Sequence, residues 1–384
     1  MRVGSSVRSL RGAAGPLLVL LWGLPWFLLG HHRAAAGLND WSNFELGARA
    51  LVGYTNAHGH TFDSGLHVYA DHPFIQIGPP ALIALVPFLA LSANTAAFGF
   101  GLLMVLALPL TVDLLRRATG VSWREVLLPA LLAAPFWCYW LAGYYRHLDD
   151  VLAMACMAGG LLAATRQRPV LTGLLLGTSM AAKPWAIVLV PLVLVLPRRQ
   201  RALGVLATLV AAGLWWGPFL LGDPGTAQAL SGFALGVDPG SALSALGVHG
   251  DVPHWARSAQ FEVGLLVTGL VTLRRDWRLA VLAGFAVRVL LDPYAWPYYA
   301  AGPLLGALGY DAVRGRRLPV GTLVTVGVFY GVPALSSFHD SATGYAKLVW
   351  CALALVVAAR SDRPGQDPRA DEPSTRTSKD AVTA

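Results

Sequence analysis

Apolar runs long enough to cross a bilayer recur along almost the whole chain, separated by polar or basic segments. The hydrocarbon core of a membrane is about 30 Å thick, which a helix of roughly 20 apolar residues spans. The runs lack the strict alternation of barrel strands. The pattern therefore predicts an all-α, polytopic transmembrane helical bundle with about 11–13 membrane segments. The runs lie near residues 12–30, 74–92, 94–115, 124–141, 150–165, 202–221, 259–273, 278–292, 295–311, 318–334 and 343–360.

One further apolar stretch is interrupted at its middle. Residues 169–197 contain Lys183-Pro184 and have arginines at both ends. Because proline breaks the helical hydrogen-bond ladder, we expect two half-length helices that enter and leave the membrane on the same side. Irregular backbone at membrane depth persists only where protein or a water-filled cavity covers it. Lys183 should therefore face a cavity; the alternative is a side chain that reaches out to the membrane interface.

The number and distribution of charged residues are typical of a membrane protein. They make up only 13% of the chain, against roughly 25% in soluble domains. The net charge of +8 does not indicate nucleic-acid binding, because the arginines cluster at the ends of apolar runs, as in cytoplasmic loops. By this rule, the polar segments 31–73 and 222–258 share the extracytoplasmic side, opposite the clusters at Arg198 and Arg314.

One basic pair conflicts with this topology. If two spans fit between residues 74 and 115, Arg116-Arg117 falls on the extracytoplasmic side. Either one of the two segments is only half inserted, or the pair is an exception to the rule.

The polar segment 31–73 follows the first apolar run directly and is the strongest functional signal. It holds six of the ten histidines and the acids Asp40, Glu45, Asp63 and Asp71. The apolar spacing after Asp40 predicts a short amphipathic helix at the membrane interface. Asp40 would cap that helix, or it would serve as a general base that the start of the helix holds rigidly in position. The two roles are compatible.

A second group of polar residues precedes the run 150–165, in the order Arg146-His147-Leu148-Asp149-Asp150. The acids complement a helix N-terminus, or they orient a sugar hydroxyl or a divalent ion. His58, His60, His67 and His72 suggest zinc only weakly, since no cysteine lies near them. We expect no metal and no other cofactor, with a divalent cation as the alternative.

Several short motifs occur in order along the chain. They are Asn39-Asp40-Trp41, Phe44-x-x-Gly47-Ala48-Arg49, Tyr69-x-x-His72-Pro73-Phe74, Pro79-Pro80 and Gly177-x-x-x-Ala181-Ala182-Lys183-Pro184. Over most of residues 12–335, this order resembles integral-membrane glycosyltransferases of the GT-C superfamily, nearest to the polyprenyl-phosphate-mannose-dependent α-mannosyltransferases (GT87-like). The resemblance implies an aspartate base early in the first external loop, which Asp40 matches. Many members carry two adjacent acids there, whereas this chain has Asn39-Asp40.

The resemblance implies a hexosyltransferase of the cell membrane, with its active site on the extracytoplasmic face. It would move mannose from a polyprenyl-phosphate sugar to a lipid-linked or cell-wall glycan acceptor. Residues 1–360 would form one transmembrane domain, and residues 361–384 a disordered polar tail. The candidate site residues are the base Asp40; Lys183, Arg146 and Arg49 for the donor phosphate; and His72, His147, Asp149, Trp296 and Tyr298 for the substrates.

Two other functions remain open. A transporter or flippase for lipid-linked glycans would have paired broken helices in two related halves, and only the segment 169–197 has such a break. A non-catalytic membrane relative of the transferases is the other alternative.

Overall fold

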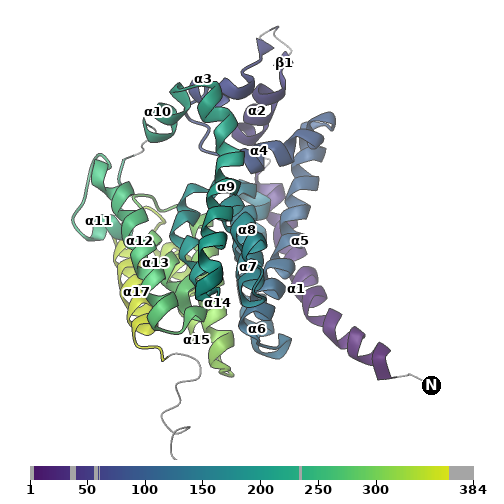
Figure 1. Cartoon of the computed structure of the whole chain (residues 1–384), viewed down its shortest axis with the longest axis vertical. Coiled ribbons are helices and arrows are strands. Elements are labelled where there is room, and N and C mark those ends of the chain that lie inside the picture. The colour runs from purple at the N-terminus through teal and green to yellow at the C-terminus, as the bar shows by residue number, and fades with distance from the viewer. Residues whose placement is uncertain (1–3, 35–39, 56–58, 60, 233–235, 363–384) are drawn as a thin grey trace, which may run out of the picture.

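The computed structural model describes residues 4–34, 40–55, 59, 61–232 and 236–362. This part of the chain is a helical bundle with one short antiparallel hairpin, β1 (Tyr54–Thr55) and β2 (Thr61–Phe62), so the all-α prediction is confirmed (Figure 1). The long helices are α1 (Gly4–Ala34), α5 (Ala93–Thr119), α6 (Trp123–Phe136) with its π-helical continuation η3 (Trp137–Tyr145), α7 (Leu148–Thr165), α9 (Arg198–Gly222), α12 (His254–Arg274) and α17 (Ser341–Ala359). The tail predicted from residue 361 lies outside the described residues from 363 on.

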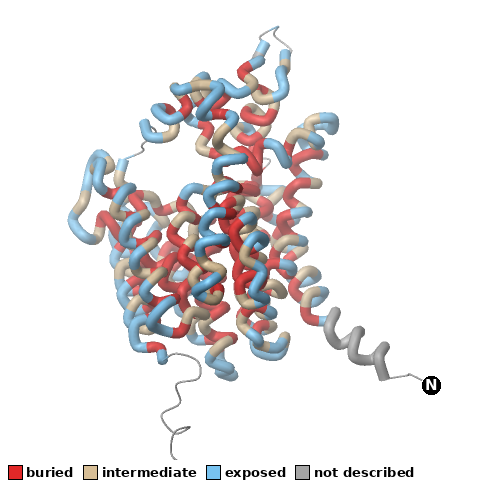
Figure 2. The backbone as a smooth tube through the Cα atoms, viewed as in Figure 1, coloured by how far each residue is buried: buried red, intermediate tan, exposed pale blue. Residues whose placement is uncertain are grey.

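Shorter elements fill the space between these helices. They are α2 (Trp41–Val52), η1 (Gly65–His67), α3 (Val68–Asp71), α4 (Pro79–Leu85), η2 (Val86–Ala90), α8 (Pro169–Ala182), η4 (Pro184–Val195), α10 (Gly225–Gly232), α11 (Ala242–Ala245), η5 (Trp277–Leu279), α13 (Ala280–Leu291), η6 (Pro297–Ala300), α14 (Ala301–Arg314), α15 (Val320–Val326), η7 (Gly327–Gly331) and α16 (Val332–Leu335). Most of α13 and α14 is buried, whereas the outer faces of α1 and α9 are exposed (Figure 2).

The apolar runs do not all become long membrane helices. In the described chain, six helices are long and apolar enough to cross a membrane: Ala14–Ala34, Ala93–Thr119, Trp123–Tyr145, Leu148–Thr165, Arg198–Gly222 and Ser341–Ala359. The runs expected near 278–292 and 295–311 form α13 and α14, with 12 and 14 residues. At 1.5 Å per residue, each is about 18–21 Å long, and the 3₁₀ turns η5 and η6 lead directly into them, so neither is a regular α-helix of membrane length.

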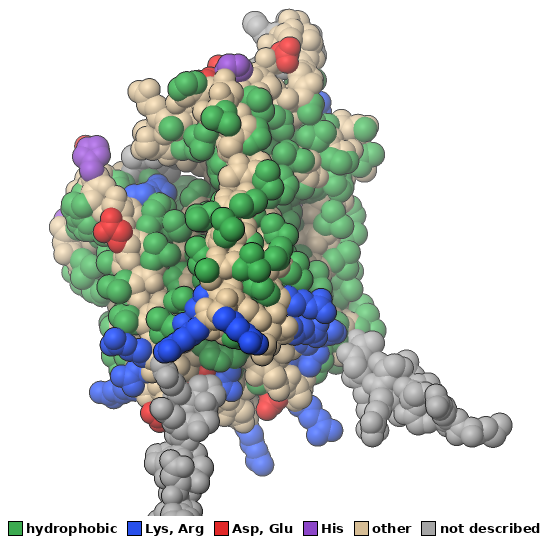
Figure 3. Space-filling view, viewed as in Figure 1, with side chains coloured by type: hydrophobic (Ala, Val, Ile, Leu, Met, Phe, Trp, Pro, Cys, Tyr) green, Lys and Arg blue, Asp and Glu red, His purple; other side chains and the backbone are tan. Residues whose placement is uncertain are grey.

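The conflict at Arg116-Arg117 is resolved because only one long helix lies between residues 74 and 115. The first predicted span is the pair of short helices α4 and η2, and α5 then runs for 27 residues to the arginines. The pair therefore lies in the last turn of α5, and Figure 3 shows that Lys and Arg side chains gather at one end of the bundle. In this described stretch, α5 is long and apolar enough to cross a membrane and residues 79–90 form only a shorter apolar helix, as the half-inserted alternative requires.

The break predicted at Lys183-Pro184 is present. Helix α8 ends at Ala182, Lys183 has extended backbone, and the 3₁₀ helix η4 begins at Pro184. A Cβ added to Gly204, near the start of α9, would lie 2.7 Å from Leu196 Cδ1 and 3.7 Å from the Pro169 carbonyl oxygen. The start of α8 and the end of η4 therefore lie together, and Lys183 is at the tip of a helical hairpin.

Small residues allow α8 to pack closely against α9. A Cβ on Gly173 would lie 2.3 Å from the Gly204 carbonyl oxygen, and one on Gly177 would lie 2.4 Å from the Thr208 carbonyl oxygen. This Gly-x-x-x-Gly spacing is typical of close helix contacts in membranes, where association depends on packing rather than on the hydrophobic effect. The contact fixes the position of the Lys183 tip.

The two long polar segments meet at the other end of the bundle. Figure 1 shows α2, α3 and α10 together at the end opposite the start of α1. His67 Nδ1 and Asp223 Oδ2 are 2.8 Å apart and join the two segments. Helix α9 begins at Arg198 and ends at Gly222, so it places the arginine cluster and the second polar segment at opposite ends.

Close packing at Gly177 gives a stability prediction. Gly177→Ala should lower the free energy of unfolding by roughly 1–3 kcal/mol, because the new methyl group meets the rigid α9 backbone. Gly213→Ala in α9 is the matched control: nothing lies within 4 Å of that position, so the better helix former should be neutral or slightly stabilising. Chemical unfolding of both variants in the same detergent measures the difference, and equal stabilities would contradict the close contact.

Candidate functional site

A cavity of about 230 Å³ lies between the first polar segment, the tip of the α8–η4 hairpin and the loop before η6. Its lining includes Asp40, Phe44, Phe74, Ile77, His147, Lys183, Trp185, Arg257, Gln260, Arg288, Asp292, Trp296, Tyr298 and Tyr299. The wall therefore combines carboxylates, cations and aromatic rings from segments far apart in the sequence. Such a mixture of apolar surface and a few converging polar groups is typical of small-molecule sites.

Asp40 lies at the start of α2, as predicted, but its side chain does not cap that helix. The carboxylate Oδ2 instead lies 2.7 Å from His147 Nε2, and the side chain is 37% exposed. Trp41 and Phe44 bury the inner face of α2 and hold its first turn in place. Asp40 is therefore fixed by a histidine and remains accessible from the cavity.

The position of His147 follows from the irregular backbone before α7. The π-helix η3 ends at Tyr145, and Arg146 takes a left-handed conformation with φ 60°. That conformation is uncommon for a residue with a Cβ and is found mostly where the surrounding structure enforces it. It turns the chain so that His147 precedes α7 and faces the cavity.

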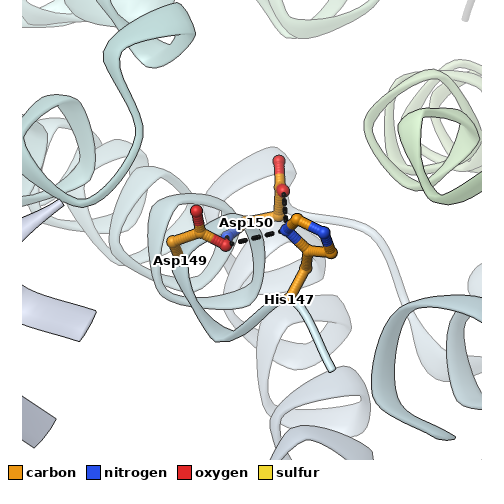
Figure 4. Close-up of side chains that lie close together, drawn as sticks. All are labelled: His147, Asp149 and Asp150. Atoms are coloured by element: carbon orange, nitrogen blue, oxygen red, sulfur yellow. Dashed lines mark hydrogen bonds and ion pairs between the residues drawn. The ribbon is translucent and has the colours of Figure 1, made fainter. Parts of the chain in front are cut away.

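His147 and Lys183 neutralise two buried acids. His147 Nδ1 lies 3.2 Å from Asp149 Oδ1 and 3.4 Å from Asp150 Oδ2 (Figure 4). Lys183 Nζ lies 2.5 Å from Asp149 Oδ2 and 3.4 Å from Asp150 Oδ2. Trp185 Nε1 donates a further hydrogen bond to Asp150 Oδ1 at 2.8 Å. Without such partners, two adjacent buried carboxylates would cost several kcal/mol each.

This network shifts the titration of Asp40 and His147. Burial alone would raise the pKa of Asp40, but the hydrogen bond from His147 and the positive charges of His147 and Lys183 outweigh it and lower that pKa. Burial alone would lower the pKa of His147, but its hydrogen bonds to Asp149, Asp150 and Asp40 raise that pKa to about 10. The imidazole is therefore protonated near neutral pH, and both ring nitrogens donate to carboxylates.

His147, Asp149 and Asp150 also offer ligand atoms that lie within 4.8 Å of one another, as in a metal site. Lys183 already contacts both carboxylates, however, and the protonated imidazole donates to them. A divalent ion would have to displace the ammonium group and deprotonate the imidazole. These residues therefore fit an internal ion network better than a metal site.

Arg288 is a second buried cation of the cavity. It is 2% exposed, and its guanidinium carbon lies 4.5 Å from the Trp185 ring centroid and 4.6 Å from that of Tyr299. Its Nε makes no hydrogen bond within the described chain and lies 3.8 Å from Asp292 Oδ2. A buried guanidinium held between two rings with a free donor is suited to an anionic ligand in the cavity.

Aromatic rings form the wall next to His147. The Tyr298 ring stacks on His147, with centroids 3.8 Å apart and planes 20° apart. Tyr145 contacts Tyr298 and Trp296 at centroid distances of 5.0 and 6.2 Å. This wall fixes the imidazole on the side that Asp40 does not contact.

The structure brings most of the candidate residues together. Five of them line the cavity, namely Asp40, His147, Lys183, Trp296 and Tyr298, and Asp149 contacts two of these from a fully buried position.

The other three candidates do not line this cavity. Arg49 pairs with Glu45 one turn earlier on α2, at 2.8 Å, and both side chains are partly buried. Arg146 lies beside His31 Nδ1, at 3.1 Å. His72 packs against the Phe74 ring, at a centroid distance of 5.9 Å.

Two residues of the site were not among the candidates: Arg288, a cation of the cavity, and Asp150, an acid of the ion network. Arg288 lies within an apolar run, and ionisable residues at membrane depth are costly and usually functional, so the sequence does carry a signal for it. For Asp150 the sequence left two roles open, at the helix N-terminus or in orienting a sugar hydroxyl or a divalent ion. No sequence signal shows that Lys183, 33 residues further along, approaches it.

Comparison with known protein families gives a match over part of the chain. Residues 77–238 match the sequence model of glycosyltransferase family 87, and no curated protein matches the chain. The match indicates a membrane glycosyltransferase. The matched segment runs from α4 to beyond α10 and contains His147, both buried acids and Lys183, whereas Asp40 and Arg288 lie outside it.

The ion network gives a second stability prediction. Lys183→Met should lower the free energy of unfolding by roughly 3–5 kcal/mol, because it leaves Asp149 and Asp150 buried beside a hydrophobic side chain. Adding Asp149→Asn should restore part of the loss, since one buried charge is then removed. Arg49→Met is the control: its ion pair with Glu45 is only partly buried and joins residues one turn apart on α2, so the cost should stay near or below about 1 kcal/mol. Unfolding curves that show no rescue by Asp149→Asn would contradict the coupling.

Proposed function

We propose that this protein transfers a hexose, by resemblance mannose, from a polyprenyl-phosphate sugar to a lipid-linked or cell-wall glycan acceptor. The observation that carries the proposal is the cavity in which Asp40, held by His147, shares one wall with the cations Lys183 and Arg288. A glycosyl transfer from a phosphate donor needs a base for the acceptor and positive charge for the leaving group. The chain supplies both without a metal ion, and we propose that none is resident.

The reaction would proceed as a substitution at the anomeric carbon of the donor. The acceptor hydroxyl oxygen forms the new bond to that carbon, and the bond between the carbon and the phosphate oxygen breaks, with its electron pair leaving on the phosphate. The hydroxyl proton passes to Asp40. Because the lowered pKa makes Asp40 a weak base, we expect it to take the proton late, when the partly bonded hydroxyl has become acidic.

Arg288 is the best candidate to bind the departing phosphate. Its guanidinium is fixed between Trp185 and Tyr299, and the free Nε leaves donor capacity for an anion. Lys183 would act mainly through its charge, since its ammonium group is already bonded to Asp149. Charge developing on the phosphate would then meet preorganised cations in a largely buried site, where electrostatic stabilisation is strong.

The active site would lie on the extracytoplasmic face of the cell membrane. The cavity is formed partly by the start of α2, at the end of the bundle remote from the arginines at the start of α9 and the end of α14. Clusters of arginine between membrane helices are typical of the cytoplasmic side. The donor would reach the cavity from the outer leaflet.

Asp40→Asn tests the base. The variant should lower turnover by roughly 10²–10⁴-fold, the usual contribution of general acid–base catalysis, while the folded protein keeps its start of α2. Transfer of labelled mannose from polyprenyl-phosphate mannose to extracted membrane glycolipids measures it, with other polyprenyl-phosphate hexoses run in parallel. Asp63→Asn, in the same polar segment but outside the cavity, is the matched control and should keep normal turnover. Near-normal transfer by a well-folded Asp40→Asn protein would remove Asp40 from this role.

Cysteine labelling tests the topology. In a background with Cys138, Cys156 and Cys351 replaced by alanine, single cysteines at the exposed positions Asp63 and Asp251 should react with a membrane-impermeant maleimide in intact cells. A cysteine at the exposed position Arg316 should react only after the membrane is opened. Opposite behaviour of positions 63 and 251 would refute a shared side.

A further inference from the structure

A second cavity, of about 480 Å³, lies on the other side of the aromatic wall of the site. It is lined by Arg33, Tyr139, Trp140, Tyr144, Tyr145, Pro297, Ser337, Phe338 and His339. We call it the aromatic cavity. Its volume falls within the range of roughly 300–1,000 Å³ that small-molecule sites occupy.

The rings of this cavity contact one another around the hollow. Tyr139 and Tyr144 are nearly parallel, at 12° and a centroid distance of 6.4 Å, and Trp140 and Tyr145 lie 6.0 Å apart. Phe338 closes the other side, 5.8 Å from Trp140. The η3 segment that carries four of these rings is a π-helix, a form that occurs mostly as short insertions and often at functional sites.

The cavity also has polar groups at its edge. Arg33 comes from the last turn of α1, and His339 is held by an ion pair of its Nδ1 with Asp238. Ser337 and the tyrosine hydroxyl groups add further donors and acceptors. Arg33, Ser337 and His339 are exposed at this edge, so a ligand in the cavity meets both ring faces and hydrated polar groups. The lining is therefore less suited to a lipid tail than to a ligand with both C–H faces and hydroxyl groups.

One layer of rings separates the two cavities. Tyr145 lines the aromatic cavity and lies 6.3 Å from the His147 ring, on which the hydrogen bond to Asp40 depends. Trp296 lines the first cavity and lies 6.0 Å from His339, which lines the second. A sugar unit in the aromatic cavity would therefore lie one ring layer away from the His147 ring that holds Asp40.

We propose that the aromatic cavity binds a sugar unit of the acceptor glycan, with Trp140 and Tyr144 as the stacking surfaces. The C–H face of a pyranose ring packs on an aromatic face, and its hydroxyl groups need the polar partners at the edge. Interfacial belt residues would instead be directed outward to lipid headgroups. The proposal rests on the proposed function, because only a glycosyltransferase gives a glycan acceptor a reason to bind beside Asp40.

The test is a binding measurement that needs no donor. The full-length protein in nanodiscs is mixed with α-1,6-mannobiose, maltose or lactose, and saturation-transfer NMR detects magnetisation passed from protein rings to sugar C–H protons. At least one disaccharide should give a signal. Trp140→Ala and Tyr144→Ala should each weaken its binding by about tenfold or more, and Trp140→Phe should keep most of it, since a ring face remains.

Trp255→Ala is the matched control, because this tryptophan is exposed on α12 and lines neither cavity. It should leave the signal unchanged. No signal with any of the three sugars, or an equal signal in folded Trp140→Ala and Tyr144→Ala proteins, would overturn the proposal. Sugar binding without hexose transfer would instead contradict the proposed function alone, so the two failures are distinguishable.

Discussion

Two adjacent carboxylates at the buried start of α7 are the constraint on which the site depends. Asp149 is fully buried and Asp150 nearly so, and neither charge is tolerable at this depth without close positive partners. Lys183 and His147 supply those partners, and each comes from a place where regular helix is interrupted. The network therefore fixes two irregular segments relative to one helix, and Asp40 takes its position from the His147 ring.

Packing of backbone against backbone holds these interruptions in place. The glycines of α8 bring it within contact of α9, so the hairpin tip cannot move without breaking that contact. Gly78, just before α4, is as constrained, because a Cβ there would lie 2.0 Å from the Ala181 carbonyl oxygen. The residues before it, including Phe74 and Ile77, form one wall of the first cavity. Small residues thus fix the position of Lys183 and of the cavity wall that contains Phe74 and Ile77.

The two cavities suit a reaction that joins two substrates. The first combines a carboxylate with cations, as expected for proton removal beside a departing phosphate, and the second is lined by rings with polar edges. Between the two cavities, Tyr298 stacks on His147, and Tyr145, which lines the aromatic cavity, contacts both Tyr298 and Trp296. A ligand that moved these rings would therefore also change the hydrogen bond between His147 and Asp40.

The sequence by itself determined the fold class, the break at Lys183 and the helix after Asp40. Each is a local property: apolar runs of membrane length, a proline in mid-run and amphipathic spacing. The number of long spans was not determined, because a run such as that of α4 and η2 has membrane-like composition but is shortened by its prolines and its contacts.

The tertiary structure alone decided which charges meet. The sequence placed Asp40 at a helix start, yet its side chain turns to His147, 107 residues away, instead of capping that helix. Arg49 and Arg146 were predicted, like Lys183, to bind the donor phosphate, but they contact Glu45 and His31 outside the cavity. Arg288, on α13, lines the cavity instead. Local sequence patterns determine how a segment forms its own backbone hydrogen bonds. The partner of a buried charge depends instead on the low dielectric of the interior and on close packing among segments distant in sequence.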